Sequence, residues 1–183
     1  MEKYIGPGEF YASDEDVIIS TLLGSCISVA LYDPITVVGG LNHFMLPFPK
    51  TKDSALQPNT TRYGINAMEM LINDILKLGG KKNQLLAKVF GGGAVLEHLT
   101  AATYDVPKMN IKFAFEFLET EGIPIKAYNV GGNLPRRLFF FPQTAKVFMK
   151  YSKKETHNLA RTEKTYSQTA DSVSVEAGTP ILF

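Results

Sequence analysis

Four pairs of adjacent glycines divide this chain into short stretches, and those stretches limit the elements that it can form. The pairs begin at Gly39, Gly79, Gly91 and Gly131. Glycine pairs commonly mark turns, because glycine adopts backbone conformations that a Cβ atom disfavours. The pairs also hint at a duplicated unit, an interpretation to which we give little weight because turns already account for them.

The first quarter of the chain predicts three strands around two chemically notable residues. Apolar runs of strand length predict strands at Val17–Ile19, Ile27–Leu31 and Val37–Met45. A turn is expected at Leu22–Ser25. Cys26 therefore opens the second strand, and His43 lies late in the third, close to a loop.

The rest of the body predicts two helices and four further strands. Apolar residues at helical spacing indicate helices at Tyr63–Leu78 and Asn110–Glu121. Strands are expected at 85–90, 123–130, 136–141 and 145–150, and the last two are expected to form a hairpin. The polar stretch Lys50–Thr61 is predicted to be a mobile loop beside the strand end that carries His43.

Length and composition favour one soluble globular body. With 183 residues, 45% of them hydrophobic and 20% charged, the chain suits a single core. The formal charge of +1 gives no electrostatic case for binding nucleic acid or an anionic membrane. Met1–Tyr4 lacks a signal-peptide pattern, and no apolar run reaches membrane-spanning length. A single cysteine excludes an internal disulfide, so we expect a reduced thiol and a cytoplasmic location.

The character of the chain changes near its end. We expect one domain over residues 1–151 and a mostly irregular C-terminal extension over residues 152–183. The extension is polar until Ile181, Leu182 and Phe183. These three side chains are predicted to dock on their own or a neighbouring body. Docking near the Lys50–Thr61 loop would let the extension cover the Cys26 pocket and restrain activity. A disordered tail is the alternative.

The only cysteine follows a flexible Gly24–Ser25 pair. A lone cysteine is often an inert core residue. At this position, however, neighbouring backbone N–H groups can lower the pKa of the thiol and form an oxyanion hole. The position thus keeps a catalytic nucleophile and a packed core residue as competing interpretations.

His43 is the histidine best placed to act with Cys26. Its predicted strand pairs with the Cys26 strand, whereas His98 and His157 lie near the triple glycine and in the extension. A thiol beside an imidazole is the arrangement that thiol hydrolases use. The hydroxyl of Thr21 or of Ser20 can orient the imidazole, and alternation along a strand lets only one of them reach it.

Two other kinds of site are not supported by the sequence. Gly91–Gly93 lacks the Gly-Lys-Ser/Thr of a phosphate-binding loop. No cluster of histidine, cysteine and carboxylate residues has metal-ligand spacing. We therefore expect no cofactor and no metal.

Five blocks of sequence, taken together, resemble the CheD family of chemoreceptor glutamine deamidases. They are Thr21–Val29, Gly40–Pro47, Arg62–Tyr63 at a helix start, Lys88–Gly92, and Gly131–Asn133 followed by Arg136. The blocks occur in family order over most of the chain. Each is weak alone, and their combination is specific.

The resemblance implies a fold, an activity and partners. The fold would be layered α+β, with packed β-sheets and helices outside, similar to the catalytic domain of cytotoxic necrotizing factor toxins. The activity would be hydrolytic deamidation of receptor glutamines to glutamate, with glutamyl methyl esters as further substrates. The partners would be chemoreceptor cytoplasmic domains and a CheC-type phosphatase, with no nucleic acid and no membrane insertion.

The resemblance leaves some positions open. Family members often have glycine after Asn-Ile in the second helix, whereas this chain has Lys112 and, further on, Phe115. The shape of that wall of the site is therefore unsettled, and the extension lies outside the resemblance.

Deamidation assigns roles to the candidate residues. Cys26 would be the nucleophile, His43 the general base and acid, and Thr21 its orienting partner, with Ser20 as the alternative. The backbone of Ser25 and Cys26 would hold the oxyanion, and Gly24 and Ser20 would also line the pocket. The competing function is a non-catalytic module that holds a CheC-type phosphatase, and an unrelated domain with a structural cysteine is a third alternative.

Overall fold

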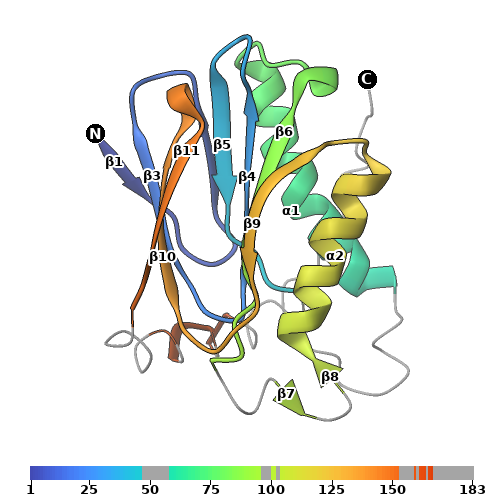
Figure 1. Cartoon of the computed structure of the whole chain (residues 1–183). Helices are drawn as coiled ribbons and strands as arrows, with labels where there is room; N and C mark the ends of the chain where they lie inside the picture. Colours follow the sequence, from blue (N-terminus) through green and yellow to red (C-terminus); the bar gives the residue numbers. More distant parts are fainter. Residues whose placement is uncertain are drawn as a thin grey trace.

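The computed structural model describes residues 1–46, 58–95, 100–101, 104–152, 159, 161–163 and 165–166. Two β-sheets pack face to face, and both long helices cover the outer face of the second sheet (Figure 1). The first sheet has the order β1 (Glu2–Tyr4), β3 (Ile18–Leu23), β10 (Arg136–Phe141) and β11 (Lys146–Tyr151). The second has the order β2 (Phe10–Ser13), β5 (Val38–Asn42), β4 (Ile27–Asp33), β6 (Leu86–Gly91) and β9 (Ile125–Val130). The predicted layered α+β class is confirmed.

The helices and a small third sheet complete the described fold. The helices are α1 (Pro58–Lys77) and α2 (Val106–Thr120), and the third sheet pairs β7 (Thr100–Ala101) with β8 (Tyr104–Asp105). Neither helix is long and apolar enough to cross a membrane, nor is any other described helical segment.

Strand β4 is buried along its whole length because both of its faces are covered. Val29 and Leu31 belong to the core cluster shared with the helices. Ala30 and Tyr32 belong to a cluster with Phe140 of the other sheet. The continuous apolar run in the sequence reflects this double burial, since side chains alternate between faces along a strand.

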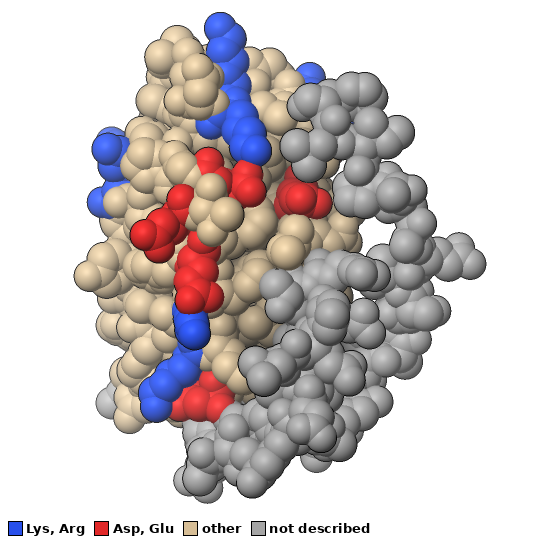
Figure 2. All heavy atoms as spheres, turned by 90° about the vertical axis from the view of Figure 1, so that its right-hand side faces the viewer, with Lys and Arg blue, Asp and Glu red and all other residues tan. Residues whose placement is uncertain are grey.

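The outer face of the helices carries charges of both signs. Figure 2 shows this face with acidic and basic side chains alternating along a narrow band. Ion pairs one turn apart on α2 account for part of this pattern: Lys112 lies 3.6 Å from Glu116, and Lys108 lies 2.8 Å from Asp105 at the helix start. The described part of this face therefore has no broad region of one sign.

Both helices begin earlier than their apolar periodicity predicts. α2 begins at Val106 because the Asp105 side chain accepts a hydrogen bond from the Lys108 N–H, which caps the helix, and Pro107 suits its first turn. α1 begins at Pro58, so the end of the predicted mobile loop is helical instead. The start of that loop, residues 50–57, lies outside the described residues.

Most predicted strands are found within two residues of their expected bounds. The terminal hairpin is confirmed, with β10 and β11 antiparallel. β1 and β2 were not predicted. They are short and flank exposed turns, so neither has an apolar run to mark it.

The C-terminal extension contacts the body through what we call the C-terminal segment, its described residues after Ser152. These are helical: Leu159, Arg161, Thr162, Glu163, Thr165 and Tyr166. Leu159 and Glu163 are buried. The residues predicted to dock, Ile181 to Phe183, lie outside the described part, and the two-region division stays a prediction.

We predict that Gly91→Ala destabilises the protein far more than Gly79→Ala. Both glycines have positive φ, 114° and 97°, so each alanine bears similar backbone strain of about 1–3 kcal/mol. A Cβ at Gly91 would overlap the Cys26 carbonyl oxygen, whereas a Cβ at Gly79 meets no atom within 4 Å. The overlap should cost roughly a further 1–3 kcal/mol in urea unfolding. Equal losses in the two variants would contradict this account.

Candidate active site

Pairing of β4 with β5 brings Cys26 and His43 to one face of the second sheet. The antiparallel ladder continues past β5 through a bridge between Ile27 and Phe44. Both of these side chains lie in the core cluster shared with the helices. Because alternate residues point to opposite faces, Cys26 and His43 point between the two sheets as diagonal neighbours.

Thr21 reaches His43 from the other sheet. Its Oγ1 lies 2.8 Å from His43 Nδ1 and also donates a hydrogen bond of 2.8 Å to the Ile5 carbonyl oxygen. A hydroxyl has one hydrogen, so Thr21 must accept from an Nδ1–H. The imidazole then carries its lone pair on Nε2, which is buried and has no hydrogen-bond partner among the described residues. This nitrogen is the one available to take a proton.

The backbone of His43 is held by the loop before β2. Its N–H donates to the Glu9 carbonyl oxygen at 2.9 Å, and its own carbonyl oxygen accepts from the Gly8 N–H at 2.7 Å. The N-terminal loop and Thr21 therefore fix both the main chain and the ring of this residue.

Ser20 lies on the opposite face of β3. Its hydroxyl donates a hydrogen bond of 2.5 Å to a Glu2 side-chain oxygen. Of the two hydroxyls considered from the sequence, the structure therefore brings Thr21 to the imidazole and leaves Ser20 elsewhere.

The three carbonyl oxygens of the Gly24–Cys26 turn all accept hydrogen bonds from other segments. The Gly24 oxygen accepts from the Gly93 N–H, and the Cys26 oxygen accepts from the Gly92 N–H, each at 2.7 Å. The Ser25 oxygen accepts from the Asn110 side-chain amide at 2.9 Å. Because a trans peptide directs its N–H opposite to its C=O, the Ser25 and Cys26 N–H groups point away from these anchors. The triple glycine thus shapes this turn.

The other side of the turn, where its N–H groups point, contacts Glu163 of the C-terminal segment. One oxygen of its carboxylate, Oε1, lies 3.0 Å from the Gly24 nitrogen and 3.3 Å from the Cys26 nitrogen. The other, Oε2, lies 3.1 Å from the Ser25 nitrogen and 2.5 Å from the Ser25 Oγ. The carboxylate thereby fills the predicted oxyanion pocket.

Burial shifts both titratable groups toward their neutral forms. It lowers the pKa of His43 to about 3, opposed in part by the Ile5 carbonyl. Burial also raises the pKa of the Cys26 thiol well above its usual value, reinforced by the charge of Glu163 and by a hydrogen bond to it. The predicted lowering of the thiol pKa is wrong here, first because the thiol is fully buried and second because the Glu163 charge lies beside it and takes up the N–H groups.

Sequence reasoning missed Asn110 and Glu163. Asn110 is fully buried, and besides holding the Ser25 oxygen it accepts a hydrogen bond of 2.8 Å from the Leu46 N–H. Its place one turn after Val106 and one before Ala114 on the buried side of α2 was the available signal. Glu163 had only a weak signal, its helical spacing from Leu159.

Other features lie apart from these residues. No group of three histidine, cysteine or acidic side chains in the described ranges is arranged to hold a metal ion.

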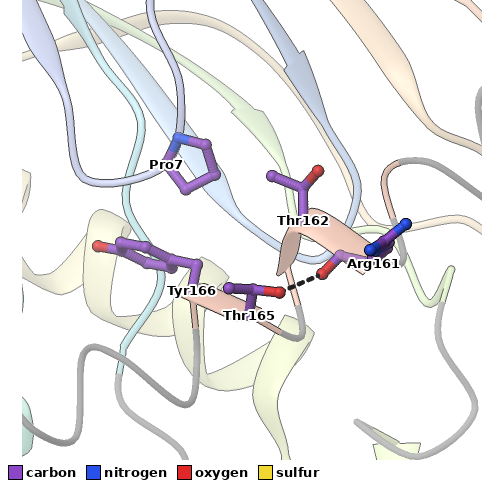
Figure 3. A pocket seen from close by; sticks show the side chains of 5 residues that line it. All are labelled: Pro7, Arg161, Thr162, Thr165 and Tyr166. Atoms are coloured by element: carbon purple, nitrogen blue, oxygen red, sulfur yellow. Dashed lines mark hydrogen bonds between the residues drawn. The ribbon is translucent and has the colours of Figure 1, made fainter.

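Phe115, noted as a departure from the family pattern, packs against Tyr128 with ring centres 5.5 Å apart. A surface hollow of about 470 Å³ is lined by Pro7 and part of the C-terminal segment, and contains none of the candidate catalytic residues (Figure 3).

Comparison with known proteins decides the family. A family model described as CheD chemotactic sensory transduction matches residues 45–151, more than half of the chain. The chain belongs to the CheD family. The matched range begins after Cys26 and His43, so it leaves the roles of these two residues open.

CheD relatives of known name share much of the sequence. One from Shewanella oneidensis, named probable chemoreceptor glutamine deamidase CheD 1, is 45% identical over 141 residues, covering 77% of this chain and 68% of its own. One from Herminiimonas arsenicoxydans, named probable chemoreceptor glutamine deamidase CheD, is 43% identical over 170 residues, covering 92% and 83%.

A solved structure also shows a weak likeness. The hypothetical protein YfiH of Bacillus licheniformis has 16% identity and a TM-score of 0.41, covering 66% of this chain and 49% of its own. This value is too low to support any argument about fold or function. The likeness to cytotoxic necrotizing factor toxins stays a prediction.

We predict that His43 makes the protein less stable as pH falls from 6.5 toward 3. Its folded pKa of about 3 lies below the unfolded value of 6.5, so the unfolded chain binds the proton first. The free energy of unfolding should then fall by up to about 1.4 kcal/mol per pH unit in this window.

Urea unfolding of the parent chain and of His43→Asn at pH 7, 6 and 5 measures this contribution. The other titratable groups are common to both proteins, so the difference in slope reports His43. Parallel pH dependences in the two proteins would show that the imidazole is not held neutral.

Proposed function

We propose that this CheD protein deamidates selected glutamine side chains of chemoreceptors to glutamate with Cys26 as the nucleophile. The names of the CheD relatives support the substrate and the reaction. The single observation that carries the residue assignment is the Thr21–His43 hydrogen bond, which leaves Nε2 unpaired on the face that Cys26 shares.

Attack on the substrate begins from neutral partners. His43 Nε2 takes the thiol proton as the Cys26 sulfur forms a bond to the side-chain carbonyl carbon of glutamine. This order suits a buried thiol of raised pKa, because no separate thiolate has to persist in the resting site. The Ser25 and Cys26 N–H groups stabilise the developing oxyanion.

The intermediate then collapses in two steps. His43 returns its proton to the leaving nitrogen, the C–N bond breaks and ammonia departs, leaving a thioester on Cys26. His43 next takes a proton from water, whose oxygen attacks the thioester, and the thiol and a glutamate side chain are released. Thr21 keeps the proton on Nδ1 throughout, so that Nε2 acts as base and acid in turn.

The same acyl chemistry extends to glutamyl methyl esters, with methanol as the leaving group. Neither the ester activity nor a CheC-type phosphatase partner has a specific contact in the described structure, and both stay predictions, as does a cytoplasmic location. The competing function, a non-catalytic module, does not require an imidazole with an unpaired Nε2 beside the thiol.

We predict that Cys26→Ala abolishes glutamine deamidation without unfolding the protein. The side chain is fully buried but small, so its loss should cost little stability beside the loss of the nucleophile. His43→Ala should lower kcat by roughly 10²–10⁴, the usual contribution of a general acid–base group.

Ammonia release and peptide mass spectrometry on receptor cytoplasmic fragments provide the measurement. An intact Cys26→Ala variant that still converts glutamine to glutamate would refute the mechanism. Phosphatase binding by a parent chain that converts no receptor glutamine, even when Glu163 is replaced by alanine, would favour the non-catalytic module.

We predict that Thr21→Ala lowers kcat whereas Ser20→Ala leaves it nearly unchanged. The loss for Thr21 should be about tenfold, the equivalent of one hydrogen bond that orients the imidazole. Ser20 is the matched control, because it is a neighbouring buried hydroxyl on the opposite face of the strand. Equal effects in the two variants would remove Thr21 from the mechanism.

A further inference from the structure

Glu163 is an unusual residue for its position. It is fully buried, although it belongs to a segment in which Arg161, Thr162 and Thr165 are exposed. A buried carboxylate is stable only when charged and polar groups satisfy its oxygens. Here both oxygens do have donors, and every backbone donor comes from the turn that includes Cys26.

The chemistry of this contact matches the end of the proposed reaction. Hydrolysis of the thioester yields a glutamate side chain whose two oxygens lie at the oxyanion donors, beside the thiol. Glu163 presents the same functional group to the same donors. The residue type and its contacts therefore both correspond to a bound product.

We propose that the Gly24–Cys26 turn is a binding site for a side-chain carboxylate, and that Glu163 occupies it as a built-in product analogue that keeps the enzyme inactive until it is displaced. The role of Glu163 as a product analogue rests on the proposed deamidase function. The occupancy itself can be tested without any enzymatic assay.

Two glycines allow the C-terminal segment to approach closely enough. A Cβ at Gly24 would lie 2.8 Å from Leu159 Cδ2 and 2.8 Å from Glu163 Oε1. A Cβ at Gly8 would lie 2.9 Å from the Tyr166 ring. Side chains at these positions would hold the segment away, so the body has a surface into which the segment fits.

Apolar contacts hold the segment on either side of the carboxylate. Leu159 is buried one helical turn before Glu163, and Tyr166 packs on the core cluster that contains Cys26. The Tyr166 ring also lies edge-on to Tyr63 of α1, with centres 6.5 Å apart. Figure 3 shows the outer side of the segment, where Thr165 Oγ1 donates to the Arg161 carbonyl oxygen one turn earlier.

This placement defines how a substrate gains access. The glutamine side chain of a receptor needs the donors that Glu163 occupies, so binding of substrate and docking of the segment exclude each other. A tethered ligand competes at an effective concentration in the millimolar range. Removing the carboxylate should therefore raise activity on receptor glutamines, by roughly tenfold or more at low substrate concentration.

The first test measures access to the thiol. Cys26 is the only cysteine in the chain, so alkylation by iodoacetamide reports this site alone. Glu163→Ala should be alkylated several-fold faster than the parent, and so should Leu159→Ser, which loosens the segment while keeping the carboxylate. Glu119→Ala, at an exposed glutamate of α2, is the matched control and should react at the parental rate. Equal rates in all four proteins would overturn the proposal.

The second test converts the product analogue into a substrate. In Glu163→Gln the chain presents a carboxamide to its own nucleophile, and Cys26 should hydrolyse it to glutamate and ammonia with one water. Peptide mass spectrometry should find residue 163 heavier by about 1 Da in Glu163→Gln and unchanged in the double variant with Cys26→Ala. An introduced carboxamide that persists while receptor glutamines are converted would overturn the proposal.

The two tests separate the inference from the proposed function. Faster alkylation of Glu163→Ala, together with no deamidation of receptors or of the carboxamide in Glu163→Gln, would support the carboxylate site and refute the deamidase function. Parental alkylation together with active deamidation of receptors would refute the inference and leave the function standing.

Discussion

The bridge between Ile27 and Phe44 is the contact on which the candidate site depends. It continues the pairing of β4 with β5 three residues past Ala30 and Leu41, where their regular ladder ends, and thereby fixes the register of Cys26 against His43. A slip of β5 by one residue would send His43 into the helix-facing core and leave Cys26 between the sheets. Phe44 packs there edge-on against Phe113 of α2, so the helix layer helps to maintain the register.

The turn that carries Cys26 is held in its conformation by hydrogen bonds from segments distant in sequence. Its carbonyl groups are held by Gly92, Gly93 and Asn110, none of which is near Cys26 in sequence. Each anchor takes one carbonyl and so directs the next N–H to the other side. The result is a row of donors that face one anion, here the Glu163 carboxylate, in the fixed arrangement that preorganised electrostatic stabilisation requires.

How far the sequence predicts this structure depends on whether the signal is local. The runs around Ile27–Leu31 and Arg136–Phe141 are apolar enough to give their strands, and the positions of Cys26 and His43 on them follow. The starts of the helices depend on capping, which apolar periodicity does not report. The raised thiol pKa comes first from burial and then from Glu163, which is 137 residues away from Cys26 in sequence, so no local pattern around the cysteine could reveal that contact.

The first nine residues support the position of His43. The main chain of His43 forms hydrogen bonds with Gly8 and Glu9. The Met1 carbonyl oxygen accepts a hydrogen bond from the Ile18 N–H at the start of β3. The first nine residues therefore hold the main chain of His43 in place. Loss of these nine residues would remove both main-chain contacts of His43 and the Ile5 carbonyl that binds the Thr21 hydroxyl, while both long helices would keep all of their own hydrogen bonds.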